Sequence, residues 1–152
     1  MGDDRESSEA AGCFGCGSAN SRGLGLVFRR GRGEESVEAT TVLDDTFAGY
    51  DGLAHGGIVS TLLDEAMGWA ILELAGRYAV TRSLSVDFRR PVRIDQQLRV
   101  HARIAGEETD GALRVEASIV DARERLLASA VGIWVPIRRS RVRRPKTAAA
   151  VS

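Results

Sequence analysis

Residues 55–65 of this chain read His-Gly-Gly-Ile-Val-Ser-Thr-Leu-Leu-Asp-Glu, and this stretch decides how the rest is interpreted. Two glycines precede an apolar run of helical periodicity, so backbone N–H groups stand open at a helix N-terminus, where partial positive charge collects. Asp64 follows two turns later inside the same run. Donors for a developing oxyanion, together with a carboxylate that drives an attack, are the parts that acyl transfer requires.

The apolar run predicts a helix from residue 56 to about residue 75, ended by Gly76. On a helical wheel, Asp64 lies at the edge of the densest apolar arc, and Glu65 lies about 100° away from it. The arc contains Val59, Leu63, Met67, Ala70 and Leu74. A carboxylate in a helix that is apolar around most of its circumference needs a partner or a chemical purpose.

Strand patterns lie on both sides of this helix. Leu24–Phe28 is expected to begin a short strand. A second strand is expected over residues 35–43, and four more over residues 78–92, 97–105, 113–120 and 126–137. The fold class is therefore α+β, with an antiparallel sheet of five to six strands wrapped around one long central helix.

Composition limits which classes of protein this chain can belong to. The chain has 152 residues and a formal net charge of zero, which suits one domain and argues against a dedicated nucleic-acid binder. We expect a folded domain over residues 12–138, an acidic disordered tail over 1–11 and a basic disordered tail over 139–152. No apolar stretch reaches membrane-spanning length and no secretory signal is visible, so we expect no membrane partner and a cytoplasmic location.

The chain has two cysteines, Cys13 and Cys16. A Cys-x-x-Cys pair could be a redox motif or half of a zinc site. No second pair and no nearby histidine accompanies it, so zinc would need ligands from elsewhere in the fold or from another subunit. The sequence favours a tight turn before the first strand, and we expect no metal.

Several motifs together resemble the hotdog-fold acyl-CoA thioesterases, in their phenylacetate-degradation-type branch. They span residues 13–137 in the order of that family, and the most specific element is His-Gly-Gly with an Asp nine residues after the His. The matching segments are residues 13–17, 23–26, 50–57, 62–68 and 83–92. The resemblance implies hydrolysis of an acyl-CoA thioester to the free acid and coenzyme A, without a cofactor.

The resemblance also implies roles for single residues. Gly57 would offer its N–H to the thioester carbonyl, Asp64 would act as nucleophile or general base, and Thr81 would help to place the water or the carboxylate. His55 would shape the turn and line the site. Some relatives carry Asn or Gln six or seven residues before the His, where this chain has Ala48 and Gly49, so a side-chain contribution from that loop is in doubt.

Four further residues are candidates for substrate binding. Gly56 would belong to the oxyanion-binding turn, and Glu65 competes with Asp64, although wheel position and spacing favour Asp64. Arg89 and Arg90 could meet the phosphates of coenzyme A, because guanidinium groups suit phosphate oxygens. The commoner alternative for these two arginines is a solvated strand end.

Helical rise predicts an oligomer. Gly57 and Asp64 are seven residues apart, roughly 10 Å along one helix, whereas a donor and an attacking group must both reach one carbonyl. Two antiparallel copies of the helix would bring Gly57 of one subunit to Asp64 of the other. We therefore expect an isologous homodimer with two equivalent sites, and a dimer of such dimers (a homotetramer) is the alternative.

Two other functions stay open at this stage. A non-catalytic hotdog module would bind acyl-CoA or another apolar ligand without productive geometry, and the residues at positions 48 and 49 give it some weight. A hotdog dehydratase or hydratase would need a catalytic His with an acidic partner. His101 is the histidine outside the His-Gly-Gly motif, and it lies in a predicted strand without that setting.

Overall fold

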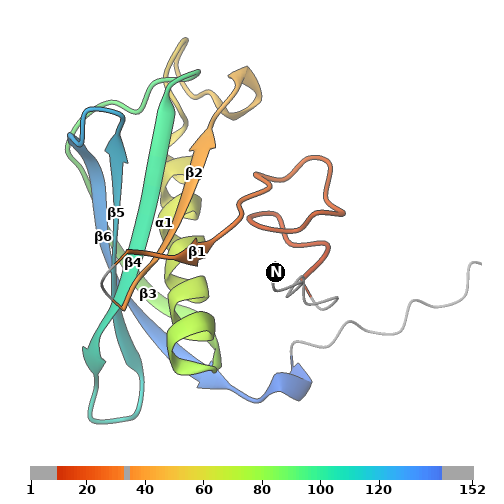
Figure 1. Cartoon of the computed structure of the whole chain (residues 1–152), viewed down its shortest axis with the longest axis vertical. Coiled ribbons are helices and arrows are strands. Elements are labelled where there is room, and N and C mark those ends of the chain that lie inside the picture. Colours follow the sequence, from red (N-terminus) through yellow and green to blue (C-terminus); the bar gives the residue numbers. More distant parts are fainter. Residues whose placement is uncertain (1–9, 33–34, 142–152) are drawn as a thin grey trace, which may run out of the picture.

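The computed structural model describes residues 10–32 and 35–141, which form one antiparallel sheet and one long helix (Figure 1). The strands are β1 (Arg29–Arg30), β2 (Val37–Val42), β3 (Tyr78–Phe88), β4 (Gln97–Glu107), β5 (Leu113–Asp121) and β6 (Leu126–Ile137). The helices are η1 (Asp45–Phe47), α1 (Gly56–Ala70), η2 (Ile71–Ala75) and η3 (Arg139–Arg141). The expected α+β hotdog architecture is confirmed, with six strands. Most of the two predicted disordered tails, residues 1–9 and 142–152, lies outside the described residues.

The strands follow the order β1-β2-β4-β5-β6-β3, and every neighbouring pair is antiparallel. Strand β3, the first after the helix, therefore lies at a sheet edge and pairs only with β6 among the described residues. An unpaired edge of 11 residues exposes a row of backbone donors and acceptors to a second chain.

The core lies between α1 and one face of the sheet. The helix buries six side chains: Val59, Leu62, Leu63, Ala66, Met67 and Ala70. Alternate residues of the central strands face them, for example Leu98, Val100 and Ala102 of β4. Truncating a fully buried leucine such as Leu63 to alanine is expected to cost about 2–5 kcal/mol of unfolding free energy.

The helix ends where the sequence predicts. After α1, residues 71–75 continue as one wider π-helical turn, η2, and Gly76 then adopts the left-handed conformation with φ of 64°. Glycine reaches this region without the clash that a Cβ atom causes, so it stops the helix and turns the chain into β3. No helix among the described residues is long and apolar enough to cross a membrane.

The first strand begins later than predicted, at Arg29 and not within Leu24–Phe28. Pairing with β2 begins only at Arg29, because Gly25 takes a left-handed φ of 60° and breaks the extended run. The N–H groups of Leu24 and Leu26 donate instead to the carbonyls of Phe14 and Gly15. Residues 10–28 are thus a separate loop, and Figure 1 shows that it lies across α1 from the sheet.

Candidate functional site

His55 caps the N-terminus of α1. Its backbone is extended, and its Nδ1 accepts a hydrogen bond of 2.9 Å from the Gly57 N–H. A side-chain acceptor at this position satisfies one of the donors that a helix leaves open. The Gly57 N–H, which the family resemblance assigns to the substrate carbonyl, is therefore engaged by the imidazole in this conformation.

Gly56 is the first residue of α1, and its N–H has no hydrogen-bond partner among the described residues. The residue is exposed, and the ring of Phe88 lies close to its Cα, since an added Cβ would be 3.7 Å from that ring. An open N–H at a helix N-terminus, beside an aromatic wall, suits an oxygen that gains negative charge.

The loop before the helix packs tightly around position 49. A Cβ on Gly49 would lie 3.2 Å from the Cα of His55, and the Gly49 N–H donates to Leu53 O. Ala48 pairs with Ala54 across the same loop. A side chain at position 49 would therefore need a small shift of the loop beside His55.

Asp64 and Thr81 meet in the structure. Asp64 is half-buried in the middle of α1, and its Oδ1 accepts a hydrogen bond of 2.6 Å from Thr81 Oγ1. The sequence predicts both residues for the site, although 17 positions separate them. A hydroxyl that donates to one carboxylate oxygen fixes the rotamer of the carboxylate and leaves its other oxygen available to a ligand.

A bulge in β3 makes this contact possible. The pairing with β6 runs Thr81 to Trp134 and then Ser83 to Ile133, so Arg82 is an extra residue. An inserted residue reverses the alternation of side chains. Thr81 therefore turns toward the helix, although Leu84 and Val86, of opposite parity, also pack against the core.

Asp64 and Thr81 line a groove of about 790 Å³ between α1, the start of β3 and the N-terminal loop. Its walls are mixed in character: Trp69, Leu72 and Trp134 supply apolar surface, and Glu65 supplies a second carboxylate. The groove is open to solvent and large enough for the acyl part of a substrate.

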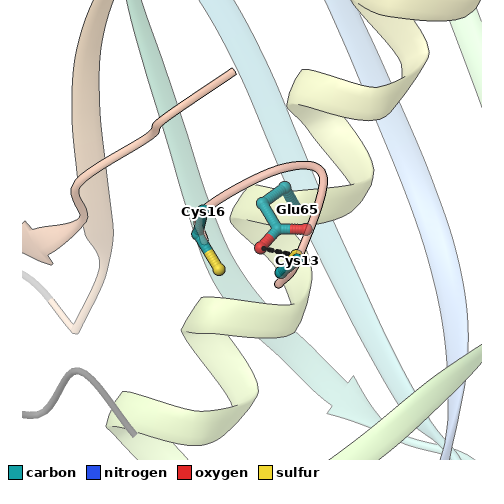
Figure 2. A group of neighbouring side chains, drawn as sticks. All are labelled: Cys13, Cys16 and Glu65. Carbon is teal, nitrogen blue, oxygen red and sulfur yellow. Dashed lines mark hydrogen bonds between the residues drawn. The ribbon is translucent and has the colours of Figure 1, made fainter. Parts of the chain in front are cut away.

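Glu65 faces the N-terminal loop rather than Asp64. Its carboxylate lies beside Cys13 and Cys16, whose sulfur atoms and the Glu65 oxygen all lie within 4.8 Å of one another (Figure 2). Cys13 Sγ is 3.6 Å from Glu65 Oε1. The sequence does not predict this cluster, because the Cys-x-x-Cys spacing gives no sign of which distant residue meets it.

The thiol of Cys16 is the strongly perturbed group of the cluster. Burial, and then the hydrogen bond and negative charge of Glu65, raise its pKa far above the usual range. Without a bound cation, Cys16 is therefore a neutral thiol at physiological pH.

Arg89 and Arg90 do not line the groove around Asp64. Arg89 pairs with Asp87 at 3.1 Å, and Arg90 Nη1 donates to Leu126 O at 2.8 Å. Both are exposed and directly follow Phe88, whose ring lies against Gly56. They are therefore on the side of the helix N-terminus.

The structure separates the expected site residues into two groups. His55, Gly56 and Gly57 lie at the start of α1, and Asp64, Glu65 and Thr81 lie about two turns further along. The rise of an α-helix puts roughly 12 Å between Gly56 and Asp64. His101 belongs to neither group, because it borders a hollow with Ser85 and Arg103 on another part of the sheet.

Comparison with known proteins gives a consistent result. Residues 51–110 match the family model of the thioesterase superfamily. Over 113 residues, the chain is 29% identical to a Pseudomonas aeruginosa protein named "Putative esterase PA0474", a match that covers 73% of this chain and 83% of that protein.

Solved structures share the fold. RHA08564, a thioesterase superfamily protein, aligns with a TM-score of 0.71 and 25% identity over 78% of this chain, which spans 60% of the length of RHA08564. PaaI of the Escherichia coli phenylacetic acid degradation operon gives a TM-score of 0.66 at 22% identity, covering 76% of this chain and 81% of PaaI. Streptococcus mutans smu.793, solved with acetyl CoA, gives 0.65 at 21% identity, covering 74% and 88%.

Proposed function

We propose that this chain is a thioesterase of the hotdog fold, whose superfamily model matches residues 51–110, and that it hydrolyses an acyl-CoA thioester to the free acid and coenzyme A. The observation that carries the proposal is the Asp64 carboxylate, fixed by Thr81 in an open groove. Similar folds have been solved with acetyl CoA and with coenzyme A, which supports a coenzyme A thioester as the substrate.

Asp64 drives the attack. It either attacks the thioester carbon itself or takes a proton from the water that does so. In both routes the C–S bond breaks, an oxygen of water enters the acid, and the sulfur leaves with a proton as coenzyme A. Thr81 holds the carboxylate toward the groove through the 2.6 Å hydrogen bond.

We assign polarisation of the thioester carbonyl to the N–H of Gly56, in place of the Gly57 N–H that the sequence analysis favours. The Gly57 N–H donates to His55 Nδ1, whereas the Gly56 N–H is open and exposed. His55 then acts indirectly, by holding the helix start in the conformation that presents Gly56.

The complete site is formed by two subunits. Gly56 and Asp64 lie too far apart on one helix to act on one carbonyl. The unpaired edge of β3 offers a way to pair two chains, and its side chains include the exposed Val80 and Phe88. In an isologous dimer, Gly56 of one subunit and Asp64 of the other form each of two sites.

Arg89 and Arg90 follow Phe88 at the Gly56 end of the helix, so a substrate whose carbonyl sits at Gly56 could extend its phosphates toward them. The groove beside Asp64, with Trp69, Leu72 and Trp134 in its walls, then receives the acyl group.

A thiol-release assay over short-chain, medium-chain and aromatic acyl-CoAs tests the proposal. Wild type should turn over at least one class, and Asp64→Asn, which keeps the shape of the side chain, should lower kcat by about three orders of magnitude or more. Equal turnover in Asp64→Asn would refute the assignment. Saturable acyl-CoA binding without turnover across the panel would instead identify a non-catalytic binding module.

A further inference from the structure

The N-terminal loop meets α1 through three groups that can bind a metal: Cys13, Cys16 and Glu65 (Figure 2). We propose that these three side chains bind one zinc ion, which fastens residues 10–28 to the central helix. The three ligands lie in the wall of the groove that also contains Asp64, but the test of zinc binding does not depend on the proposed hydrolysis.

The spacing of the ligand atoms suits a tetrahedral ion. Zinc–sulfur bonds of about 2.3 Å and zinc–oxygen bonds of about 2.0 Å give ligand separations of roughly 3.3–3.8 Å. Cys13 Sγ and Glu65 Oε1 are already 3.6 Å apart, and all three ligand atoms lie within 4.8 Å of one another. Contraction by about an ångström completes this part of the shell.

The loop is shaped around the first sulfur atom. The Gly15 N–H donates to Cys13 Sγ at 3.3 Å, and the Gly17 N–H donates to the Cys13 carbonyl at 2.9 Å. The backbone donor at Gly15 fixes where the Cys13 sulfur lies. Zinc binds a cysteine sulfur as the thiolate. The loop thus presents both cysteines in one turn, directed at the helix.

The two buried glycines of the turn lie very close to their neighbours. A Cβ on Gly15 would lie 2.5 Å from the Glu65 carboxylate, and one on Gly17 would lie 2.4 Å from the Cys13 nitrogen. Gly17 thus lets the turn close on its own backbone, and Gly15 lets it approach the Glu65 side chain without displacing it.

Charge also favours a cation. Glu65 takes part in none of the ion pairs formed by residues 10–32 and 35–141. Within the described residues, this half-buried carboxylate has thiol hydrogen-bond neighbours but no cationic side chain paired with it. Zinc supplies two positive charges, and its binding releases the two thiol protons to solvent.

The chemistry of the donors selects the metal. Two thiolates with one carboxylate suit zinc better than the hard cations calcium and magnesium, which prefer oxygen alone. Three protein ligands leave the fourth tetrahedral position to a water molecule. The neighbouring stacking of Phe28 on Trp69, with ring centroids 6.0 Å apart, attaches the far end of the loop to the same helix.

Cobalt, a spectroscopic substitute for zinc, tests the site in the full chain. The protein is stripped of metal with a chelator under reducing conditions and titrated with Co²⁺, then with Zn²⁺. We expect one ion per chain, sulfur-to-cobalt charge-transfer absorption, tetrahedral ligand-field bands, and loss of both on zinc addition. Absence of these bands, or a Cys13–Cys16 disulfide that resists reduction in the folded protein, would overturn the proposal.

Two variants and one control sharpen the result. Cys16→Ser should abolish the charge-transfer band, and Glu65→Gln should weaken zinc binding at least about tenfold. Glu73→Gln, which removes a carboxylate elsewhere after α1, should leave affinity unchanged. Unchanged affinity in Glu65→Gln would show binding by the thiols alone and overturn the three-ligand site. If Cys16→Ser fails to fold, the comparison of the two Gln variants decides.

Discussion

Thr81 Oγ1 donates a 2.6 Å hydrogen bond to Asp64 Oδ1, and this contact joins the start of β3 to the middle of α1. The contact depends on the bulge at Arg82, which turns Thr81 toward the helix. It leaves Asp64 Oδ2 free to face a ligand in the groove. The two residues form a unit in which the hydroxyl orients the carboxylate.

Removal of the Thr81 hydroxyl should lower kcat more than it changes KM. Thr81→Val keeps the branched shape but cannot donate to Asp64, and a hydrogen bond to a charged group is worth roughly 1.5–3 kcal/mol, or about 10- to 100-fold in rate. Thr81→Ser restores the donor and should recover most of the activity. If Val and Ser variants are equally impaired, Thr81 acts through packing and not through its hydrogen bond.

The open N–H at Gly56 can be removed without breaking the helix. Proline suits the first position of a helix, and His55 before it has the extended ψ of 134° that proline requires. Gly56→Pro should therefore lower kcat about 10²- to 10³-fold, the usual effect of losing an oxyanion donor.

Gly56→Ala is the matched control, because it keeps the N–H and adds a Cβ at an ordinary 3.7 Å from Phe88. It should retain activity within several-fold of wild type. Steady-state kinetics with circular dichroism of both variants checks the prediction. Comparable rates in the proline variant and the alanine variant would show that the Gly56 N–H does not polarise the carbonyl, and would assign this role to Gly57.

Much of the fold could be predicted from the sequence, because local pattern and tertiary structure agree there. The apolar periodicity from Val59 to Ala70 matches the buried helix face, and Gly76 ends the helix as its position indicates. The exception is Leu24–Phe28, where an apolar run looks like a strand but Gly25 turns the chain and the loop takes its hydrogen bonds.

The site was harder to predict because it depends on contacts that spacing does not encode. The motif indicates Asp64 and Thr81. Strict alternation of side chains along a strand, however, puts Thr81 and Leu84 on opposite faces of the sheet. Only the bulge brings both of them to the side of the helix. Which of two adjacent glycines keeps a free N–H is set by the His55 side chain. The meeting of Glu65 with the two cysteines requires the path of the whole loop.

The stability of the folded protein should depend on pH through Asp121. Its carboxylate, 5% exposed, accepts hydrogen bonds from the N–H groups of Arg123 and Arg125 and from Arg125 Nε, which fixes the turn between β5 and β6. Burial opposes ionisation, but these hydrogen bonds outweigh it and hold the pKa of Asp121 below its ordinary value of 3.8. The charged form is therefore favoured in the folded state.

A carboxyl group whose pKa is lower in the folded state stabilises the protein at pH values above its unfolded-state pKa. This stabilisation is lost as the pH falls through the folded-state pKa. Asp121→Asn should thus lower Tm at neutral pH, and the difference from wild type should shrink as the pH falls below about 4. Asp51→Asn, at an exposed loop position, is the control and should show little difference at either pH. A Tm difference for Asp121→Asn that stays constant on acidification would contradict the linkage.

The shared site predicts complementation between two inactive variants. A heterodimer of Gly56→Pro and Asp64→Asn subunits contains one site with both mutations and one with neither, if each site takes Gly56 from one subunit and Asp64 from the other. Random exchange at equal amounts makes about half of the dimers mixed, each with one intact site, so about one quarter of wild-type activity should return. The measurement is thiol release after the variants are unfolded and refolded together, beside each variant refolded alone. No recovery in a mixture shown to contain heterodimers would mean that the donor and the carboxylate act within one subunit. The helix start would then have to bend or move, because eight residues of helical rise separate the two groups by roughly 12 Å.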